Sequence, residues 1–259
     1  MKILTLTENT TSDPRLLCEH GLSLYIETGD RKILFDSGQS DAFAQNAKKL
    51  GVDLSQVDFA VLSHGHYDHG GGLTHFLELN DHAPVYLSTH AFGGHYNASD
   101  KYIGLNPVLA ESNRLHFVQE ELFLDESIRI YPNLGEFLPN PIDPCGLQMM
   151  KNGALTAEDF RHEIYLQITE NDKQFLFSGC SHMGIENIVQ HFSPNYFFGG
   201  FHLSKVSDGK RLQHTAEILH ESGAVCYTGH CTGAHQFSIL KTVLKEQLFY
   251  LSTGTQVVI

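Results

Sequence analysis

The sequence predicts a mixed α/β fold built from two sheet-forming halves, each followed by helices. Strand-like and helix-like patterns alternate along the 259 residues, and 41% of these are hydrophobic, which is enough to bury a substantial core. No run approaches the roughly 20 apolar residues that a bilayer-spanning helix needs. We therefore expect one domain over residues 1–259, without a membrane partner.

The amino-terminal half begins with a predicted strand at residues 1–7. Residues 22–26 and 33–35 have the pattern of a β-hairpin. Residues 41–50 have helical composition and end at a glycine, which is favoured just beyond helix C-termini. Residues 59–62 form a short apolar run with the length and branching of a buried strand.

The carboxy-terminal half repeats this order. Residues 164–169 and 174–177 read as a second hairpin around Asn171 and Asp172. Helices are predicted downstream at 184–191, 212–221 and 234–246.

The middle segment, residues 90–144, is less regular because it holds five of the eight prolines. Such a composition favours loops with short strands. We expect this loop-rich segment to cover a functional site and to set specificity. Its polar and aromatic candidates, each more readily explained as structural, are His90, His95, Tyr96, Tyr102 and Arg114.

Three imidazoles and a carboxylate follow the apolar strand at 59–62, in the pattern His64-x-His66-x-Asp68-His69. In extended chain His64 and His66 share one side, and the turn into the following glycines lets Asp68 and His69 reach a neighbouring position. Two adjacent metal positions are therefore predicted. Imidazole nitrogen and carboxylate oxygen suit zinc, iron, manganese or nickel, and a catalytic site keeps one coordination place open.

The net charge and the cysteine content limit which binding partners and metal sites are expected. A formal net charge of −13 argues against a nucleic-acid partner, whereas a small anionic substrate stays compatible because bound cations make a pocket locally positive. The five cysteines lack the spacing of a zinc knuckle or redox pair, and Cys231 is expected to point away from any site as a small buried thiol. Without a signal-like start, a cytoplasmic location is predicted. The oligomeric state is left open.

The histidine cluster resembles the signature of the metallo-β-lactamase superfamily, and further motifs extend the resemblance. The stretch 32–38 resembles the first motif, a strand ending in Asp-x-Gly that here holds Asp36. The stretches 177–184 and 227–233 resemble the motifs that bring later ligand histidines, here His182 and His230. Finer similarities at 19–23, 199–203 and 230–233 resemble the subgroup named after dihydropterin-ribofuranosyl-aminobenzene-phosphate synthase.

This resemblance implies a four-layer αββα sandwich with one or two divalent metal ions per chain, zinc first and iron or manganese as alternatives. It implies that His64, His66 and His182 bind one metal, while the second position is formed by Asp68, His69 and His230. Asp36 is expected to hydrogen-bond a ligand histidine.

The sequence departs from the family pattern at one motif. Many members carry a bridging Asp there, but this chain offers His202 and no acid before Asp208. The second metal position is therefore weaker, differently ligated or empty. Ligation by His202 and contact of His202 with an anionic group of the substrate are equally open.

The predicted activity is hydrolysis of a small ester, lactone or phosphodiester by a metal-bound hydroxide, with Asp68 orienting the nucleophile or moving its proton. Three alternatives stay open. They are the transfer reaction in the subgroup's name, di-iron redox chemistry of the kind that usually needs a fused flavin domain, and non-catalytic metal or ligand binding.

Overall fold

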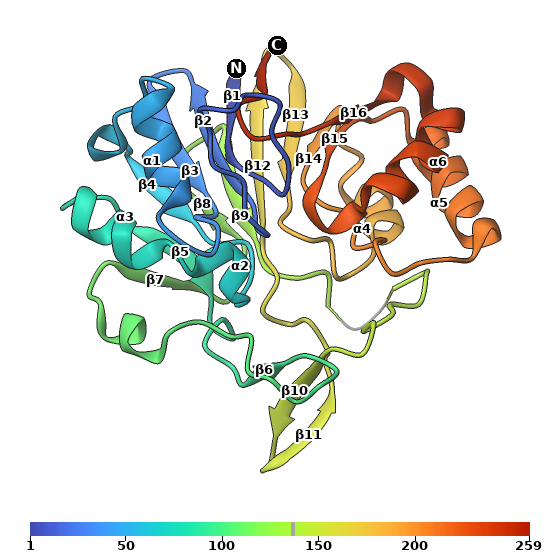
Figure 1. Cartoon of the computed structure of the whole chain (residues 1–259), viewed down its shortest axis with the longest axis horizontal. Helices are drawn as coiled ribbons and strands as arrows, with labels where there is room; N and C mark the ends of the chain where they lie inside the picture. The colour runs from blue at the N-terminus through green and yellow to red at the C-terminus, as the bar shows by residue number, and fades with distance from the viewer. Residues whose placement is uncertain (136–137) are drawn as a thin grey trace.

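Two seven-stranded sheets pack face to face and carry helices on their outer faces, as the αββα expectation requires (Figure 1). The computed structural model describes residues 1–135 and 138–259. In hydrogen-bonded order the first sheet contains β17 (Gln256–Val258), β1 (Lys2–Thr7), β2 (Ser23–Thr28), β3 (Arg31–Phe35), β4 (Phe59–Val61), β5 (Val85–Ser88) and β7 (Leu115–Val118). The second contains β16 (Leu248–Tyr250), β15 (Val225–Thr228), β14 (Tyr196–Phe198), β13 (Lys173–Phe177), β12 (Tyr165–Glu170), β9 (Ile128–Tyr131) and β8 (Leu122–Phe123).

The two sheets are built alike. Each has antiparallel neighbours on one side and a run of parallel strands on the other: β3, β4, β5 and β7 in the first sheet, and β13 to β16 in the second. Parallel neighbours end at the same edge, so the loops after these strands are brought together.

Helices cover the outer faces, one group on each sheet (Figure 1). Their bounds are α1 (Ala42–Lys49), α2 (Tyr67–Gly70), α3 (Leu73–Leu79), α4 (Ile185–Phe192), α5 (Gly209–Ser222) and α6 (Ala234–Leu244). Short 3-10 turns lie at η1 (Leu54–Gln56), η2 (Pro107–Glu111), η3 (His230–Thr232) and η4 (Lys245–Gln247). The ends of α5 follow from its sequence, since the Asp208 side chain caps the start and Gly223 adopts the left-handed conformation at the end.

Successive side chains of a strand point to opposite faces of its sheet, so the buried apolar side chains form three separate cores. In β3, Ile33 and Phe35 face the second sheet, whereas Leu34 faces the helices of the first. Phe35 meets Phe177 across the sandwich at a ring-centroid distance of 5.9 Å. The third core lies between the second sheet and α4 to α6.

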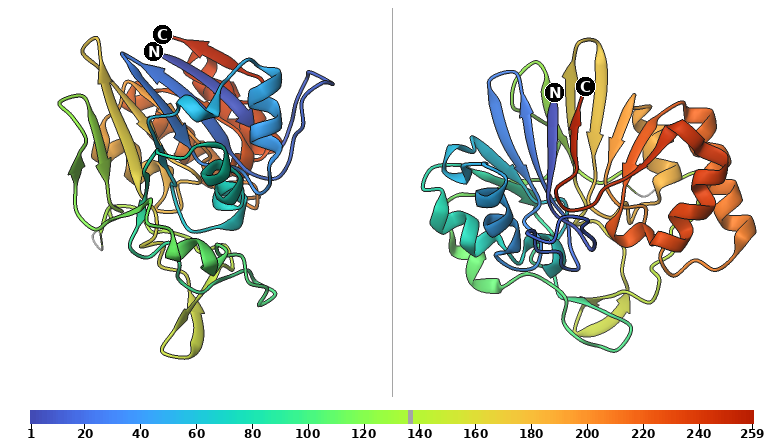
Figure 2. Two further views of the ribbon diagram at one scale, coloured as in Figure 1. Left: turned by 90° about the vertical axis from the view of Figure 1, so that its left-hand side faces the viewer. Right: turned by 45° about the horizontal axis from the view of Figure 1, so that its top comes forward.

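A small third sheet projects beyond the sandwich in all the ribbon views (Figure 2). It consists of β11 (Ala154–Ala157), β10 (Gln148–Lys151) and β6 (His95–Tyr96). The predicted loop-rich segment 90–144 supplies β6, but it also supplies β7, β8 and β9 to the main sheets. Residues 136–137 of that segment lie outside the described residues.

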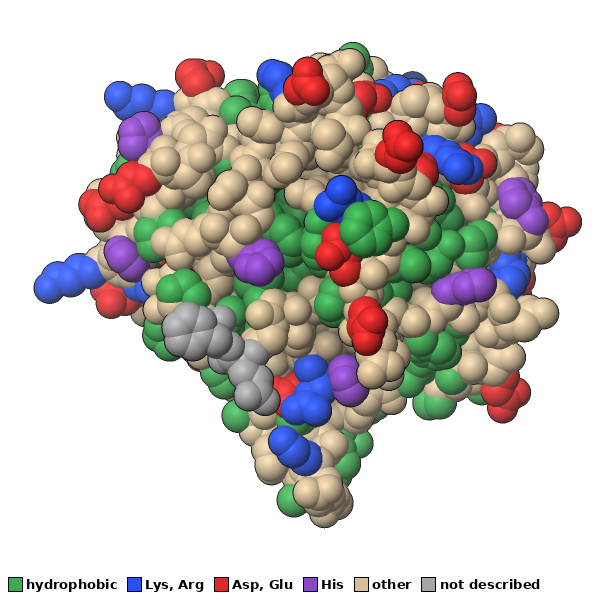
Figure 3. All heavy atoms as spheres, turned by 180° about the vertical axis from the view of Figure 1, so that it is seen from behind, with side chains coloured by type: hydrophobic (Ala, Val, Ile, Leu, Met, Phe, Trp, Pro, Cys, Tyr) green, Lys and Arg blue, Asp and Glu red, His purple; other side chains and the backbone are tan. Residues whose placement is uncertain are grey.

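On the face drawn in Figure 3, basic side chains are scattered among acidic ones. Within the described part of that face, the basic groups therefore form no continuous track for a phosphate backbone. None of the helices in residues 1–135 and 138–259 combines the length and hydropathy that spanning a bilayer requires.

We expect Phe177→Ala to lower the free energy of unfolding by about 3–5 kcal/mol, because Phe177 is fully buried between the sheets and its loss leaves a cavity. Denaturant unfolding monitored by circular dichroism measures this change. The control Val108→Ala, at a side chain that is 70% exposed, should change stability by less than about 0.5 kcal/mol. Equal effects of the two variants would contradict the placement of Phe177 in the core.

Candidate metal centre

The polar motifs found in the sequence all follow strands at one edge of the sandwich. Asp36 follows β3, His64 follows β4, His182 follows β13, His202 follows β14 and His230 follows β15. Asp36, His202 and His230 have φ of 58°, 53° and 48°, the left-handed region that side chains rarely adopt. Such strain concentrates where surrounding contacts hold functional groups in place.

The first candidate position is formed by His64, His66 and His182, whose ligand atoms all lie within 4.8 Å of one another. The three side chains are 0%, 4% and 4% exposed. Nε2 of His64, Nε2 of His66 and both ring nitrogens of His182 have no hydrogen-bond partner among the described residues. Buried polar atoms without partners are costly, so this trio needs a cation or another ligand.

The hydrogen bonds of His64 leave its Nε2 free to bind a metal. Ser63 Oγ donates to Asp36 Oδ2 (2.7 Å) and therefore accepts the proton of His64 Nδ1 (2.9 Å). With that proton on Nδ1, the lone pair of Nε2 points toward the other two imidazoles.

The second candidate position is formed by Asp68, His69 and His230. Nε2 of His69 lies 3.1 Å from Nε2 of His230, which lies 3.3 Å from Asp68 Oδ2. His69 Nδ1 donates to Asp36 (2.7 Å), so Asp36 contacts one of the histidines that the sequence assigns to the second position. His230 Nδ1 donates to Asn9 Oδ1 (2.8 Å). Both Nε2 atoms therefore face the carboxylate of Asp68, and each can bind a metal once its proton is displaced.

Burial and nearby charge set the protonation of these groups. Burial lowers the pKa of His64 and of His182 well below the usual histidine value, and lowers that of His66 to about 3. Burial would also lower the pKa of His69, but the charges of Asp36 and Asp68 raise it to about 9. The first trio is therefore neutral, which is the ligand form of imidazole, whereas a cation at the second position would displace a proton from His69.

These observations fit divalent metal ions. Three neutral imidazoles converge in the first position, and two imidazoles and a carboxylate converge in the second. A cation between such buried polar groups would offset the cost of burying them. The donor set of nitrogen and oxygen is the one that zinc, iron and manganese share.

Two buried carboxylates outside the predicted set of ligands hold the loops that carry the candidate ligands. Glu8 accepts the backbone N–H of His230 (2.5 Å), and Glu163 accepts the backbone N–H of His182 (2.8 Å). Both glutamates are fully buried. Glu8 directly follows a strand, as Asp36 does, and this placement is the signal that would have pointed to it.

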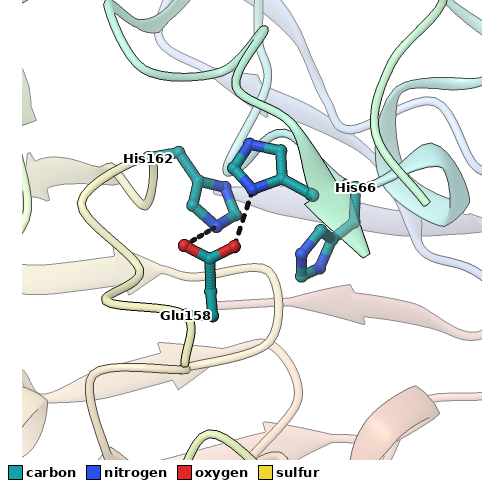
Figure 4. A group of neighbouring side chains, drawn as sticks. His66, Glu158 and His162 are labelled. Atoms are coloured by element: carbon teal, nitrogen blue, oxygen red, sulfur yellow. Dashed lines mark hydrogen bonds and ion pairs between the residues drawn. The ribbon is translucent and has the colours of Figure 1, made fainter. Parts of the chain in front are cut away.

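A further cluster next to His66 contains His95, Glu158 and His162, all buried (Figure 4). His162 Nδ1 accepts the backbone N–H of Gly65 (2.8 Å), so the proton of this neutral ring lies on Nε2. A protonated Nε2 does not bind a metal. We therefore interpret His162 as a support for the loop between His64 and His66. Glu158 accepts the proton of His95 Nδ1 (2.8 Å).

Other candidates of the segment 90–144 support the backbone. The Arg114 guanidinium donates to the carbonyls of Leu77 and Ala83, and the Tyr102 hydroxyl donates to the carbonyl of Leu105.

The position of the Cys231 thiol differs from the one expected from the sequence. Cys231 does not point away from the site, because residues 230–232 form the 3-10 turn η3 instead of continuing the strand. Its Sγ, Cys180 Sγ and a ring nitrogen of His202 lie within 4.8 Å of one another. Cys180 Sγ is also 3.2 Å from His69 Nε2. Sequence reasoning treated these cysteines as isolated because they are 51 residues apart.

A cavity of about 500 Å³ opens over the centre and is lined in part by Asp68, His182, His202 and His230. Lys205 lies in its wall. A neighbouring cavity of about 530 Å³ shares His182, His202 and Lys205 with it and adds Arg211. These volumes are of the size that small-molecule ligands occupy.

Comparisons with known proteins identify related chains. The family model described as the metallo-beta-lactamase superfamily matches residues 17–219. The chain is 30% identical to 7,8-dihydropterin-6-methyl-4-(beta-D-ribofuranosyl)-aminobenzene-5'-phosphate synthase of Methanocaldococcus jannaschii, over 98% of this chain and 95% of the relative. An uncharacterized protein of the same organism is 29% identical over 87% of this chain and 88% of its own length. A solved structure described as a metal-dependent hydrolase of the β-lactamase superfamily superimposes with a TM-score of 0.84 at 28% identity, covering 100% and 99% of the two chains.

We expect Asp36→Asn to weaken metal binding about 10- to 100-fold, because the amide no longer orients His64, through Ser63, and His69 for metal binding. Competition with a chelator measures the affinity. The control Asp172→Asn, in the exposed turn between β12 and β13, should bind metal as the unaltered protein does. Equal affinity of both variants would show that Asp36 does not orient the ligands.

Proposed function

Since the chain belongs to the metallo-β-lactamase superfamily, we propose that it is a metal-dependent hydrolase of a small ester, lactone or phosphodiester. The observation that carries this proposal is the convergence of Asp68 and buried imidazoles beneath the cavity, several of them without a hydrogen-bond partner among the described residues. That arrangement suits activation of water beside a bound substrate.

The proposed ligands are His64, His66 and His182 at one position. At the other they are Asp68, His69 and His230. We propose zinc as the metal, with iron or manganese as alternatives, because each of them accepts this donor set. When bound, the metal ions lower the pKa of water and polarise an acyl or phosphoryl oxygen.

Asp68 is the proposed catalytic residue because its carboxylate reaches the cavity while it contacts the second position. Burial raises the pKa of Asp68, but the charge of His69 and hydrogen bonds from His20 and His230 lower it well below the usual value. The group is therefore an ionised hydrogen-bond acceptor, which suits it to orient a water molecule and to relay its proton without holding it. His20 Nε2, 3.2 Å from Asp68 Oδ2, lies toward solvent and gives that proton a route out.

The proposed substrate is small and anionic. Lys205 is the only Lys or Arg lining the cavity over the centre within the described part of the chain, and it lies between that cavity and the neighbouring one. If a negatively charged group of the substrate bound to Lys205, the reactive carbon of an ester, or the phosphorus of a phosphodiester, would lie near the metal positions. No nucleic-acid partner is proposed, given the charge of −13.

A second candidate function is a transfer reaction like that in the name of the 30% identical synthase, which matches this chain nearly end to end. Both reactions place a phosphorylated or acylated centre over the same residues. Incubation of the metal-loaded protein with a pterin diphosphate and an aminobenzene acceptor, with products identified by mass spectrometry, separates them. A joined product would favour transfer, and release of the free acid or phosphate would favour hydrolysis.

We expect Asp68→Asn to lower kcat about 10²- to 10⁴-fold, because the amide cannot take up a proton. Turnover is measured on a panel of esters, lactones and phosphodiesters, together with the metal content of each sample. Asp81→Asn, at a carboxylate whose side chain is fully exposed, is the matched control and should keep full turnover. Unchanged turnover in the Asp68 variant would rule out the assigned role.

We expect Lys205→Gln to raise KM for anionic substrates about five- to tenfold and to leave kcat nearly unchanged, since the lost charge contributes to binding alone. A neutral ester of the same size should show no change in KM. Lys210→Gln, on the exposed surface of α5, is the control. A loss of kcat without a change in KM would contradict a binding role for Lys205.

A further inference from the structure

The two candidate metal positions have no acidic residue between them among the described residues. The loop after β14 brings His202, and the next acid, Asp208, is used to cap α5. One side chain does lie between the positions. The ligand atoms of Cys180, His64 and His69 are within 4.8 Å of one another, and these two histidines belong to different positions.

We propose that Cys180 is a thiolate ligand of the metal centre, between the first and second positions. This inference rests on the proposed metal-dependent function. It adds a sulfur to a donor set that otherwise consists of nitrogen and oxygen, and it explains how the centre is completed without a bridging carboxylate. Thiolate sulfur is a strong ligand for zinc and for iron.

The distances suit a shared metal. Two ligands bound to one tetrahedral zinc, with Zn–N of about 2.0 Å and Zn–S of about 2.3 Å, lie roughly 3.5 Å apart. Cys180 Sγ lies 3.2 Å from His69 Nε2. On the other side His64 Nε2 is fully buried and has no hydrogen-bond partner in the part of the chain that the structure describes. Only small movements would place one ion against sulfur and nitrogen together.

The hydrogen bond of Cys180 is the one that a metal would replace. His69 Nδ1 donates to Asp36, and a hydrogen bond of 3.2 Å joins His69 Nε2 to Cys180 Sγ. A metal ion taking the place of the proton in this hydrogen bond binds the sulfur and the nitrogen and releases the proton to solvent. Cys180 is 3% exposed and lines the cavity, so a metal has access to it.

Cys231 differs from Cys180 although the two thiols are neighbours. Its Sγ accepts the backbone N–H of His202 (3.3 Å), and its S–H donates to the carbonyl of Cys180 (3.6 Å). A side chain at Gly200 would collide with this sulfur, so the loop after β14 is packed directly on it. Cys231 also lies beside Cys180 Sγ and a ring nitrogen of His202, but among the described residues it shares no cluster with His64 or His69. We therefore assign it the role of joining the loops after β13, β14 and β15.

The test uses the full-length protein loaded with Co²⁺, because thiolate ligation gives Co²⁺ an intense near-ultraviolet charge-transfer band that nitrogen and oxygen ligands do not give. Unaltered protein should show the band, and Cys180→Ala should lose it. Cys231→Ala and Cys226→Ala should keep it. Cys226 is a matched control because it is fully buried in β15 and lies in the core between the second sheet and its helices.

Two further readouts accompany the spectra. Cys180→Ala should bind Co²⁺ at least about tenfold more weakly than the other two variants, since a ligand is missing. Metal loading should also release one proton fewer per centre from Cys180→Ala, as measured with a pH indicator in weak buffer. Circular dichroism checks that each variant is folded. X-ray absorption on the unaltered zinc protein tests the ligation without any substitution, and should detect sulfur at about 2.3 Å from the metal.

The outcomes separate this inference from the proposed function. Metal binding and hydrolysis by the unaltered protein, with neither the band nor a sulfur neighbour, would overturn the thiolate ligand and leave the hydrolase proposal standing. A band that persists in Cys180→Ala and disappears in Cys231→Ala would also overturn it. A protein that binds no metal under any supplementation would overturn both proposals.

Discussion

The carboxylate of Asp36 is the interaction on which the rest of the centre depends. It accepts hydrogen bonds from the backbone and the hydroxyl of Ser63 and from His69, each at 2.7 Å. Through Ser63 it fixes the tautomer of His64 at one position, and it fixes that of His69 directly at the other. A single buried anion therefore orients imidazoles in both positions. Such an anion is tolerated in the interior because all three donors point at it.

Other carboxylates around the site hold backbone loops in the same way. Glu8 holds the loop of His230, Glu163 holds the loop of His182, and Glu19 accepts the backbone N–H groups of Gln39 and Ser40 near Asp36. Each carboxylate follows or faces a strand end and binds backbone N–H groups that the sheet leaves unpaired. The loops that carry the candidate ligands are therefore held by fixed hydrogen bonds within the protein, which would preorganise the site for a metal.

Local pattern predicted much of the fold and the first ligands. Residues that are close together in the sequence are enough to predict the two hairpins, the main helices and the cluster of His64, His66, Asp68 and His69. Strands β14 to β17 escaped prediction because they are three or four residues long and lack clear alternation. The contacts of Glu8 with His230, and of Cys180 with His69, join residues far apart in the chain, so no sequence window contains them.

Charge explains how an acidic protein could attract an anionic substrate. The formal charge of −13 is spread over the molecule, and at physiological salt its field is screened beyond about 8 Å. In the cavity over the centre Asp68 is the only carboxylate and Lys205 the only Lys or Arg among the described lining residues. Two divalent ions at the proposed positions would therefore outweigh the local negative charge. The charge of bound metal ions would act within the cavity, and the one carboxylate that lines it, Asp68, is already hydrogen-bonded. Attraction of an anion would therefore depend on metal loading instead of on the surface charge.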